Sequence, residues 1–221
     1  MIPRRLRLPF MLAAALLAGC TNQAGTAPAA APLASGARAR LPAVRDERSG
    51  LRLQSCGDLL AALRAGQDLG EIPERQEFAD YEGCIRDALA RHGRGYRSGR
   101  FDLARGGDQI YRDLDLATVH SSLAPRRPAE HYRLSDFHFD TVRAGGLWLE
   151  LADSAFAYRV DILTIGDFRH RGQAELLVRF TDRATRGGTY DRTTLLVLDI
   201  APDSGTITAT DALEVLAAAL R

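Results

Sequence analysis

The chain has 221 residues, of which 46% are hydrophobic, 26% charged and 7% aromatic, and this is the composition of a soluble globular protein. It excludes a disordered or collagen-like chain, and three cysteines are too few for a small disulfide-stapled fold. The net charge of +1 predicts no general attraction to nucleic acid, and all 29 basic residues are arginine, which excludes lysine-dependent chemistry.

The first 20 residues carry the features of a cleavable export signal. Arginines near the start precede an apolar segment, residues 8–18, that is much shorter than the ~20 residues of a transmembrane helix. The segment ends in Leu17-Ala18-Gly19-Cys20, which resembles the lipobox of bacterial lipoproteins. The resemblance implies that residues 1–19 are a signal peptide that is removed, and that Cys20 then carries a diacylglycerol and an acylated amino group.

The residues after Cys20 predict where the protein is anchored and how. The next residue is Thr21, whereas in many Gram-negative bacteria an Asp at this position retains lipoproteins in the inner membrane. The resemblance therefore implies a lipid anchor in the outer membrane, with the folded part facing the periplasm. Residues 20–50 are rich in Ala, Pro, Gly and Arg and cannot bury enough apolar surface to offset the entropy of ordering. We expect a flexible lipidated tether over 20–50 and a single domain over 51–221.

The first half of this domain predicts helices. Ser55 is suited to cap a helix that ends at Gly66, because leucines follow it at helical spacing. A second helix is expected from about Pro73 to Gly93, since proline is favoured in a first turn and glycine after a last one. Apolar residues at helical spacing predict a third helix over 106–119.

The second half predicts antiparallel strands and a last helix. Runs of β-branched and aromatic residues are separated by Gly, Asp and Ser. The strands are expected over 147–151, 158–165, 174–181 and 194–200. Asp211 and Glu214 form the pattern of a capping box at the start of a final helix. The sequence therefore predicts an α+β fold with N-terminal helices, then an antiparallel sheet, then a C-terminal helix.

Two cysteines remain in the domain, Cys56 and Cys84. In an oxidising periplasm an even pair is expected to form a disulfide, which would join the first predicted helix to the second. The alternative is a reactive thiol activated by His92. That histidine is eight residues from Cys84, which is two helical turns and too far for a local pair.

A divalent metal site is a second possibility, at Asp136, His138 and Asp140. Phenylalanines alternate with these residues, so a strand would place the three polar side chains on one face. Carboxylates and an imidazole are metal ligands, and His120 or His131 would complete the set if the fold brought them close. We favour an amphipathic strand with a solvated polar face, because side chains two residues apart diverge. No cofactor is predicted.

Four arginines, Arg91, Arg94, Arg97 and Arg100, recur at every third position after the second predicted helix. They are candidates for binding an anion, such as the phosphates of lipid A or the carboxylates of peptidoglycan stems. We favour a solvated helix exit, since cations near a helix C-terminus are favourable and charge runs are usually surface.

The segment Gly166–Val178 resembles the D-F-N-G-D-G-x-x-D-L-L-V motif of FG-GAP repeats, in which a loop between two strands binds calcium. Asp167 and Glu175 stand at acidic positions of the motif, but Arg169 and Arg171 replace oxygen-bearing ligands. Two cations at ligand positions oppose calcium binding. The sequence therefore predicts a loop that has lost calcium and pairs Asp167 and Glu175 with these arginines.

Two classes of function fit these observations. We favour a non-catalytic outer-membrane lipoprotein that binds an envelope protein or glycan, or helps assembly. Its partners would be the membrane, through the N-terminal lipid, and that envelope component, but not nucleic acid. The alternative is a periplasmic metal-dependent hydrolase that uses the residues around His138. The first class is favoured because the sequence contains no convergent catalytic motif.

Replacing the predicted lipidation site tests the anchor. Cys20→Ser is expected to release the protein from the membrane fraction or to leave it unprocessed, because serine offers no thiol for the diacylglycerol. Fractionation and mass spectrometry of the N-terminal peptide measure this. The Cys56→Ser/Cys84→Ser variant is the matched control and should stay acylated. A Cys20→Ser protein that remains acylated and membrane-bound would contradict the prediction.

Overall fold

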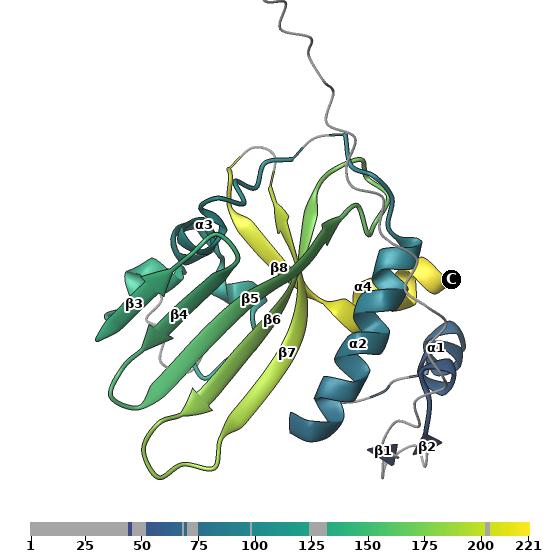
Figure 1. Ribbon diagram of the computed structural model, residues 1–221, viewed down its shortest axis with the longest axis horizontal. Helices are drawn as coiled ribbons and strands as arrows, with labels where there is room; N and C mark the ends of the chain where they lie inside the picture. Colours follow the sequence, from purple (N-terminus) through teal and green to yellow (C-terminus); the bar gives the residue numbers. More distant parts are fainter. Residues whose placement is uncertain are drawn as a thin grey trace, which may run out of the picture. The chain divides into compact units, whose positions relative to one another are not determined.

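The computed structural model describes residues 44–45, 52–67, 69, 75–97, 99–123, 132–201 and 204–221 (Figure 1). All of them belong to one of two compact units of the chain, Arg38–Arg221. Cys20, the expected signal peptide and His131 lie outside the described residues. Strand β1 (Val44–Arg45) lies within the segment expected to be a tether and pairs antiparallel with β2 (Arg52–Leu53).

The main element is a six-stranded antiparallel sheet in which each strand pairs with its neighbours in sequence. Its strands are β3 (Thr141–Ala144), β4 (Trp148–Ala152), β5 (Phe156–Gly166), β6 (Glu175–Ala184), β7 (Asp191–Ile200) and β8 (Ile207–Asp211). The four middle strands lie where the sequence predicts strands, whereas β3 and β8, at the edges, were not predicted. With helices before the sheet and one after it, the predicted α+β class is confirmed.

Four α-helices accompany the sheet in the described part of the chain. They are α1 (Cys56–Arg64), α2 (Arg75–His92), α3 (Gly106–Asp113) and α4 (Ala212–Leu220). The Ser55 hydroxyl accepts the N–H of Asp58 at 3.2 Å, and the Asp211 carboxylate accepts the N–H of Leu213 at 2.8 Å, so both predicted caps are present. Within the described part of the chain, no helix combines the length and apolar character required to cross a membrane.

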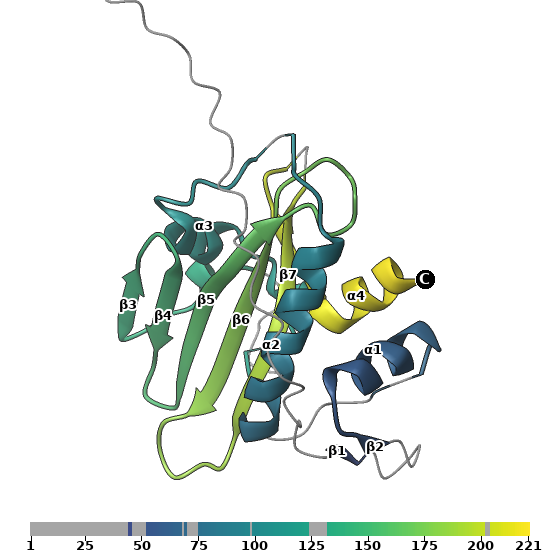
Figure 2. The same cartoon turned by 45° about the vertical axis from the view of Figure 1, so that its right-hand side comes forward.

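The sheet has a different cover on each face because its side chains alternate. On one face, Tyr158, Val160 and Leu176 join a core closed by α3 and two short 3₁₀ helices, η1 (Leu116–Thr118) and η3 (Leu134–Asp136). On the other face, Leu177 and Val197 pack beneath α1, α2 and α4. Figures 1 and 2 show α2 beside β6 and β7 and no helix over β3 and β4 on this second face.

The third helix is shorter than the expected 106–119. It ends at Asp113, because Leu114 adopts an extended backbone and bridges to Ile207 of β8. The Asp115 carboxylate then accepts the N–H of Ala117 at 2.8 Å and starts η1. Aspartate competes with the helix backbone in this way, and the extended residues cover the edge of β8.

A disulfide joins Cys56 to Cys84, as the sequence predicts. The two Cα atoms are 5.6 Å apart, and the bond connects the first turn of α1 to the middle of α2. It closes a loop with a sequence separation of 28 residues. The bond therefore holds the two helices together beside β7.

The disulfide is expected to contribute roughly 3 kcal/mol to the free energy of unfolding, because it restricts a long loop in the unfolded chain. The Cys56→Ala/Cys84→Ala variant should therefore unfold at a lower urea concentration than the parent protein. Mass spectrometry without reductant should detect the linked peptides in the parent. Equal urea midpoints for the two proteins, or quantitative alkylation of both thiols without reductant, would contradict this.

Candidate functional site

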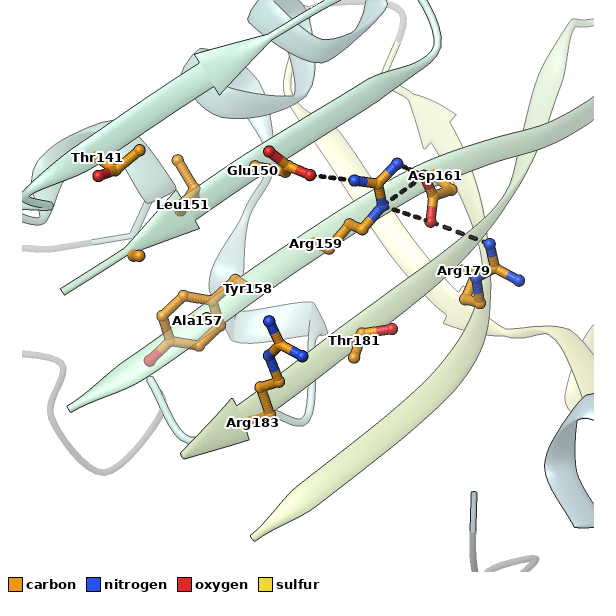
Figure 3. A pocket seen from close by; sticks show the side chains of 11 residues that line it. Thr141, Glu150, Leu151, Ala157, Tyr158, Arg159, Asp161, Arg179, Thr181 and Arg183 are labelled. Atoms are coloured by element: carbon orange, nitrogen blue, oxygen red, sulfur yellow. Dashed lines mark hydrogen bonds and ion pairs between the residues drawn. The ribbon is translucent and has the colours of Figure 1, made fainter. Parts of the chain in front are cut away.

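The part of the second sheet face that no helix covers is the most distinctive surface of the described chain. We call it the open face; it comprises the side chains of β3, β4, β5 and the second half of β6 that point away from α3. It contains a hollow of about 440 Å³ (Figure 3). Its lining includes Thr141, Ala152, Ala157, Thr181 and Arg183. Cavities of this size accept small molecules.

The register of the strands creates the hollow. Ala152 of β4 lies directly opposite Ala157 of β5, and Ala157 lies opposite Arg183 of β6. Thr141 of β3 lies opposite Ala152. Two alanines side by side form a low floor, and the longer side chains of the neighbouring rows rise around it. The hollow thus forms because short side chains on neighbouring strands lie between longer ones.

A chain of ion pairs borders the hollow. Arg159 bridges Glu150 of β4 and Asp161 of its own strand, with its Nε donating to Asp161 Oδ1 at 2.8 Å. Arg179 of β6 donates to the second oxygen of Asp161 at 3.1 Å and to Glu82 of α2 at 3.1 Å. Figure 3 shows the sheet part of this series, from Glu150 through Arg159 and Asp161 to Arg179. Two arginines and three carboxylates therefore alternate in one series of ion pairs from β4 to α2.

The surroundings of Asp161 and Arg179 favour their charged forms. Burial opposes the ionisation of Asp161, but the hydrogen bonds from Arg159 and Arg179 outweigh it and hold the pKa of Asp161 below its ordinary value. Burial likewise opposes the charge of Arg179, yet the hydrogen bonds and charges of Asp161 and Glu82 raise its pKa. The stabilisation from Asp161 is present above its unfolded pKa and is lost only when the pH falls through the lower folded value.

Arg183 stands outside this series. Its side chain is exposed, lines the hollow, and has no hydrogen bond or ion pair with any group in the described part of the chain. Figure 3 shows it next to Thr181, apart from the dashed ion pairs. Of the arginines that line the hollow, Arg183 is therefore the one without an ion pair among the described residues, although Asp191 of β7 lies opposite it in the register.

The loop between β5 and β6 holds a second, buried cluster of charges around Glu175. This carboxylate is fully buried and accepts the N–H groups of Phe168 at 2.8 Å and Arg169 at 3.0 Å. The Arg171 guanidinium donates to it at 2.7 Å and also pairs with Asp199 of β7. Arg169 forms a further ion pair with Glu175 at 3.0 Å. The carboxylate of Glu175 is buried, whereas the side chains of Arg169 and Arg171 reach the solvent.

The expected pairing of this loop is correct for Glu175 and wrong for Asp167. The buried carboxylate of Asp167 accepts the backbone N–H groups of Arg171 and Gly172, both at 2.7 Å, instead of pairing with an arginine side chain. The chain turns sharply here, with positive φ at His170 and Gly172, and its N–H groups point at the carboxylate. Asp167 thus orders the turn, and Glu175 neutralises the arginines.

The four arginines proposed as an anion site are exposed and do not line the hollow. Arg91 lies in the last turn of α2. The backbone of Arg94 exchanges two hydrogen bonds of 3.1 Å with Asp167, and the N–H of Arg97 donates to the carbonyl of Gly172. Backbone hydrogen bonds therefore fix this segment along the loop between β5 and β6. Arg100 follows it on the surface.

The strand expected around His138 is absent. Asp136 ends the 3₁₀ helix η3, and its carboxylate accepts the N–H groups of Tyr132 and Arg133 at 3.0 and 2.9 Å. These bonds to the backbone replace strand pairing. His138 and Asp140 follow in exposed positions before β3. No group of three or more His, Cys, Asp or Glu side chains among the described residues is placed to hold a metal.

The sequence interpretation missed the residues of the hollow. The alternation from Phe156 to Asp161 does indicate one apolar and one polar face. It does not indicate which residues of β4 and β6 lie opposite Ala157, because the register depends on the whole sheet. A signal that was available is the pair of small residues, Ala152 and Ala157, placed symmetrically about the short turn between two predicted strands.

Comparison with known proteins gives no match of this chain to any protein-family model, to any curated protein or to any solved structure. The function must therefore be argued from the residues and their geometry.

The loop between β5 and β6 is expected to keep its shape without calcium, because Arg169 and Arg171 already neutralise Glu175. The melting temperature should not change when millimolar calcium replaces a chelator. Asp167→Ala should destabilise the protein by about 3 kcal/mol in either buffer, because each lost hydrogen bond to the carboxylate contributes roughly 1.5 kcal/mol. A saturable rise in melting temperature with calcium that Asp167→Ala abolishes would show that the loop binds the ion.

Proposed function

We propose that this protein is a lipid-anchored, non-catalytic binding module of the bacterial outer membrane, and that it binds its envelope partner through the open face. The observation that carries the proposal is the hollow, which lies where the helices leave the sheet uncovered. A sheet face that only stabilises a fold is normally apolar and covered, or flat and solvated. This one is hollowed and bordered by fixed charges.

The arrangement of charges suits binding better than chemistry. Arg159, Asp161 and Arg179 hold one another in place, so the border of the hollow is rigid before any ligand arrives. Preorganised side chains lower the entropy cost of binding. A hydrolase would need a nucleophile or a general base that is free to react, and the two carboxylates that line the hollow, Glu150 and Asp161, are both held by Arg159.

The anchor supports the same function. The lipobox resemblance at Cys20 predicts attachment to the outer membrane, and residues 20–50 predict a tether, so the domain would reach partners within the periplasm. The disulfide between α1 and α2 fits an oxidising compartment. Possible partners are therefore proteins or glycans of the envelope, and nucleic acid is not among them.

Site-specific photocrosslinking in living cells tests this function. A photoreactive amino acid in place of Thr141, at the rim of the hollow, should form a discrete adduct with an envelope protein or with the cell-wall glycan. The same amino acid in place of Arg186, which is exposed in the hairpin between β6 and β7, is the matched control and should form no adduct. Equal adducts at both positions, or none at Thr141, would contradict binding through the open face.

A further inference from the structure

We propose that the hollow binds a small ligand through a single carboxylate group, which forms a salt bridge with Arg183. This inference rests on the proposed binding function and adds the chemistry of the ligand. The body of the ligand lies on the floor of Ala152 and Ala157. The hydroxyl groups of Thr141 and Thr181 lie at its sides.

The pattern of ion pairs around the hollow points to an anion. Three arginines line it, Arg159, Arg179 and Arg183. The first two already pair with Glu150, Asp161 and Glu82 of α2, so three arginines face three acids in total. Among the arginines of the lining, only Arg183 forms no ion pair with a described residue, although Asp191 of β7 lies opposite it in the register, and a ligand with one negative charge complements its guanidinium.

The same residues favour a carboxylate over a phosphate. A guanidinium group presents parallel N–H donors that match the oxygens of a carboxylate and of a phosphate alike, so the preference depends on the acids beside the site. A doubly charged phosphate monoester would also lie near Asp161 and Glu150, which are on the same sheet face and are held by their arginines. These carboxylates repel the second negative charge of a phosphate, so the site accepts a ligand with one negative charge more easily than a ligand with two.

The floor of the hollow limits the rest of the ligand. The methyl groups of Ala152 and Ala157 form its apolar base, so a short aliphatic body is favoured there. Such a carboxylate occurs at the C-terminus of a peptide and on an acidic sugar. Both have the chemistry that the hollow requires, and two probes distinguish them: N-acetylalanylalanine for the peptide and N-acetylmuramic acid for the sugar.

Titration of the ¹⁵N-labelled protein by NMR tests the inference. Each probe is compared with its neutral amide, which keeps the body but removes the charge. We expect saturable shifts of the amide signals of Ala152, Ala157 and Thr181 with at least one acid and not with its amide. Binding in the millimolar range is expected for so small a ligand, so the titration extends to about 20 mM. Whichever acid shifts these signals identifies the source of the carboxylate.

Three variants make the test specific. Arg183→Gln should weaken binding about tenfold or more, and Ala157→Leu, which fills the hollow, should abolish it. Arg112→Gln is the matched control: it also removes an exposed arginine, but this one lies on α3, at the other face of the sheet, and does not line the hollow. The ¹⁵N spectrum of each free variant shows whether it is folded.

Several results would overturn the inference: no saturable shift with either acid, equal shifts with acid and amide, or an equal loss of binding in Arg112→Gln. Inorganic phosphate that binds at the same residues more tightly than the acids would also overturn it. Failure here is distinct from failure of the proposed function, because crosslinks from Thr141 with no carboxylate binding would leave the open face as a binding surface with another ligand chemistry.

Discussion

The double ion pair of Arg179 sets the border between the covered and the open parts of the sheet. Its guanidinium contacts Glu82 on α2 and Asp161 on β5, so one side chain joins the helical layer to the middle of β5, next to the uncovered part of the sheet. Toward β7 and β8 the same sheet face carries Leu177, Val197 and the helices above them. Toward β3 the polar side chains begin, and there the sheet is free to contact another molecule.

The two charged clusters of the protein have different consequences. Around Glu175 every partner is internal, and the buried carboxylate is shared by backbone N–H groups and by Arg169 and Arg171. That cluster fixes the loop between β5 and β6, together with the segment at Arg94 that pairs with it. Around the hollow the ion pairs leave the guanidinium of Arg183 without a partner among the described residues. The cluster around Glu175 therefore has a structural role, whereas the guanidinium of Arg183 is accessible to a ligand.

Local physical chemistry explains which parts of the fold could be predicted. The caps at Ser55 and Asp211 depend on residues within one turn, and the disulfide depends on there being two cysteines in the domain. The strands from β4 to β7 contain enough β-branched and aromatic residues to be recognised as strands in the sequence. Edge strands β3 and β8 are only four and five residues long, and their stability comes from pairing with neighbours.

The expectations that proved wrong share one cause. At Asp115 and Asp136 a carboxylate binds nearby backbone N–H groups, which ends a predicted helix in one case and replaces a predicted strand in the other. Asp167 does the same in the turn after β5. Hydrophobic periodicity does not show these bonds. The hollow was missed for a different reason, since it depends on the register that places Ala152, Ala157 and Arg183 side by side.

A crystal structure of the protein soaked with the acid that shifts the NMR signals would test the central claim most directly. The account predicts that the carboxylate lies within hydrogen-bonding distance of the Arg183 guanidinium, with the aliphatic body over Ala152 and Ala157 and the ion pairs of Arg159 and Arg179 unchanged. An acid bound elsewhere, or one that breaks the pair of Asp161 with Arg179 to reach its site, would contradict it.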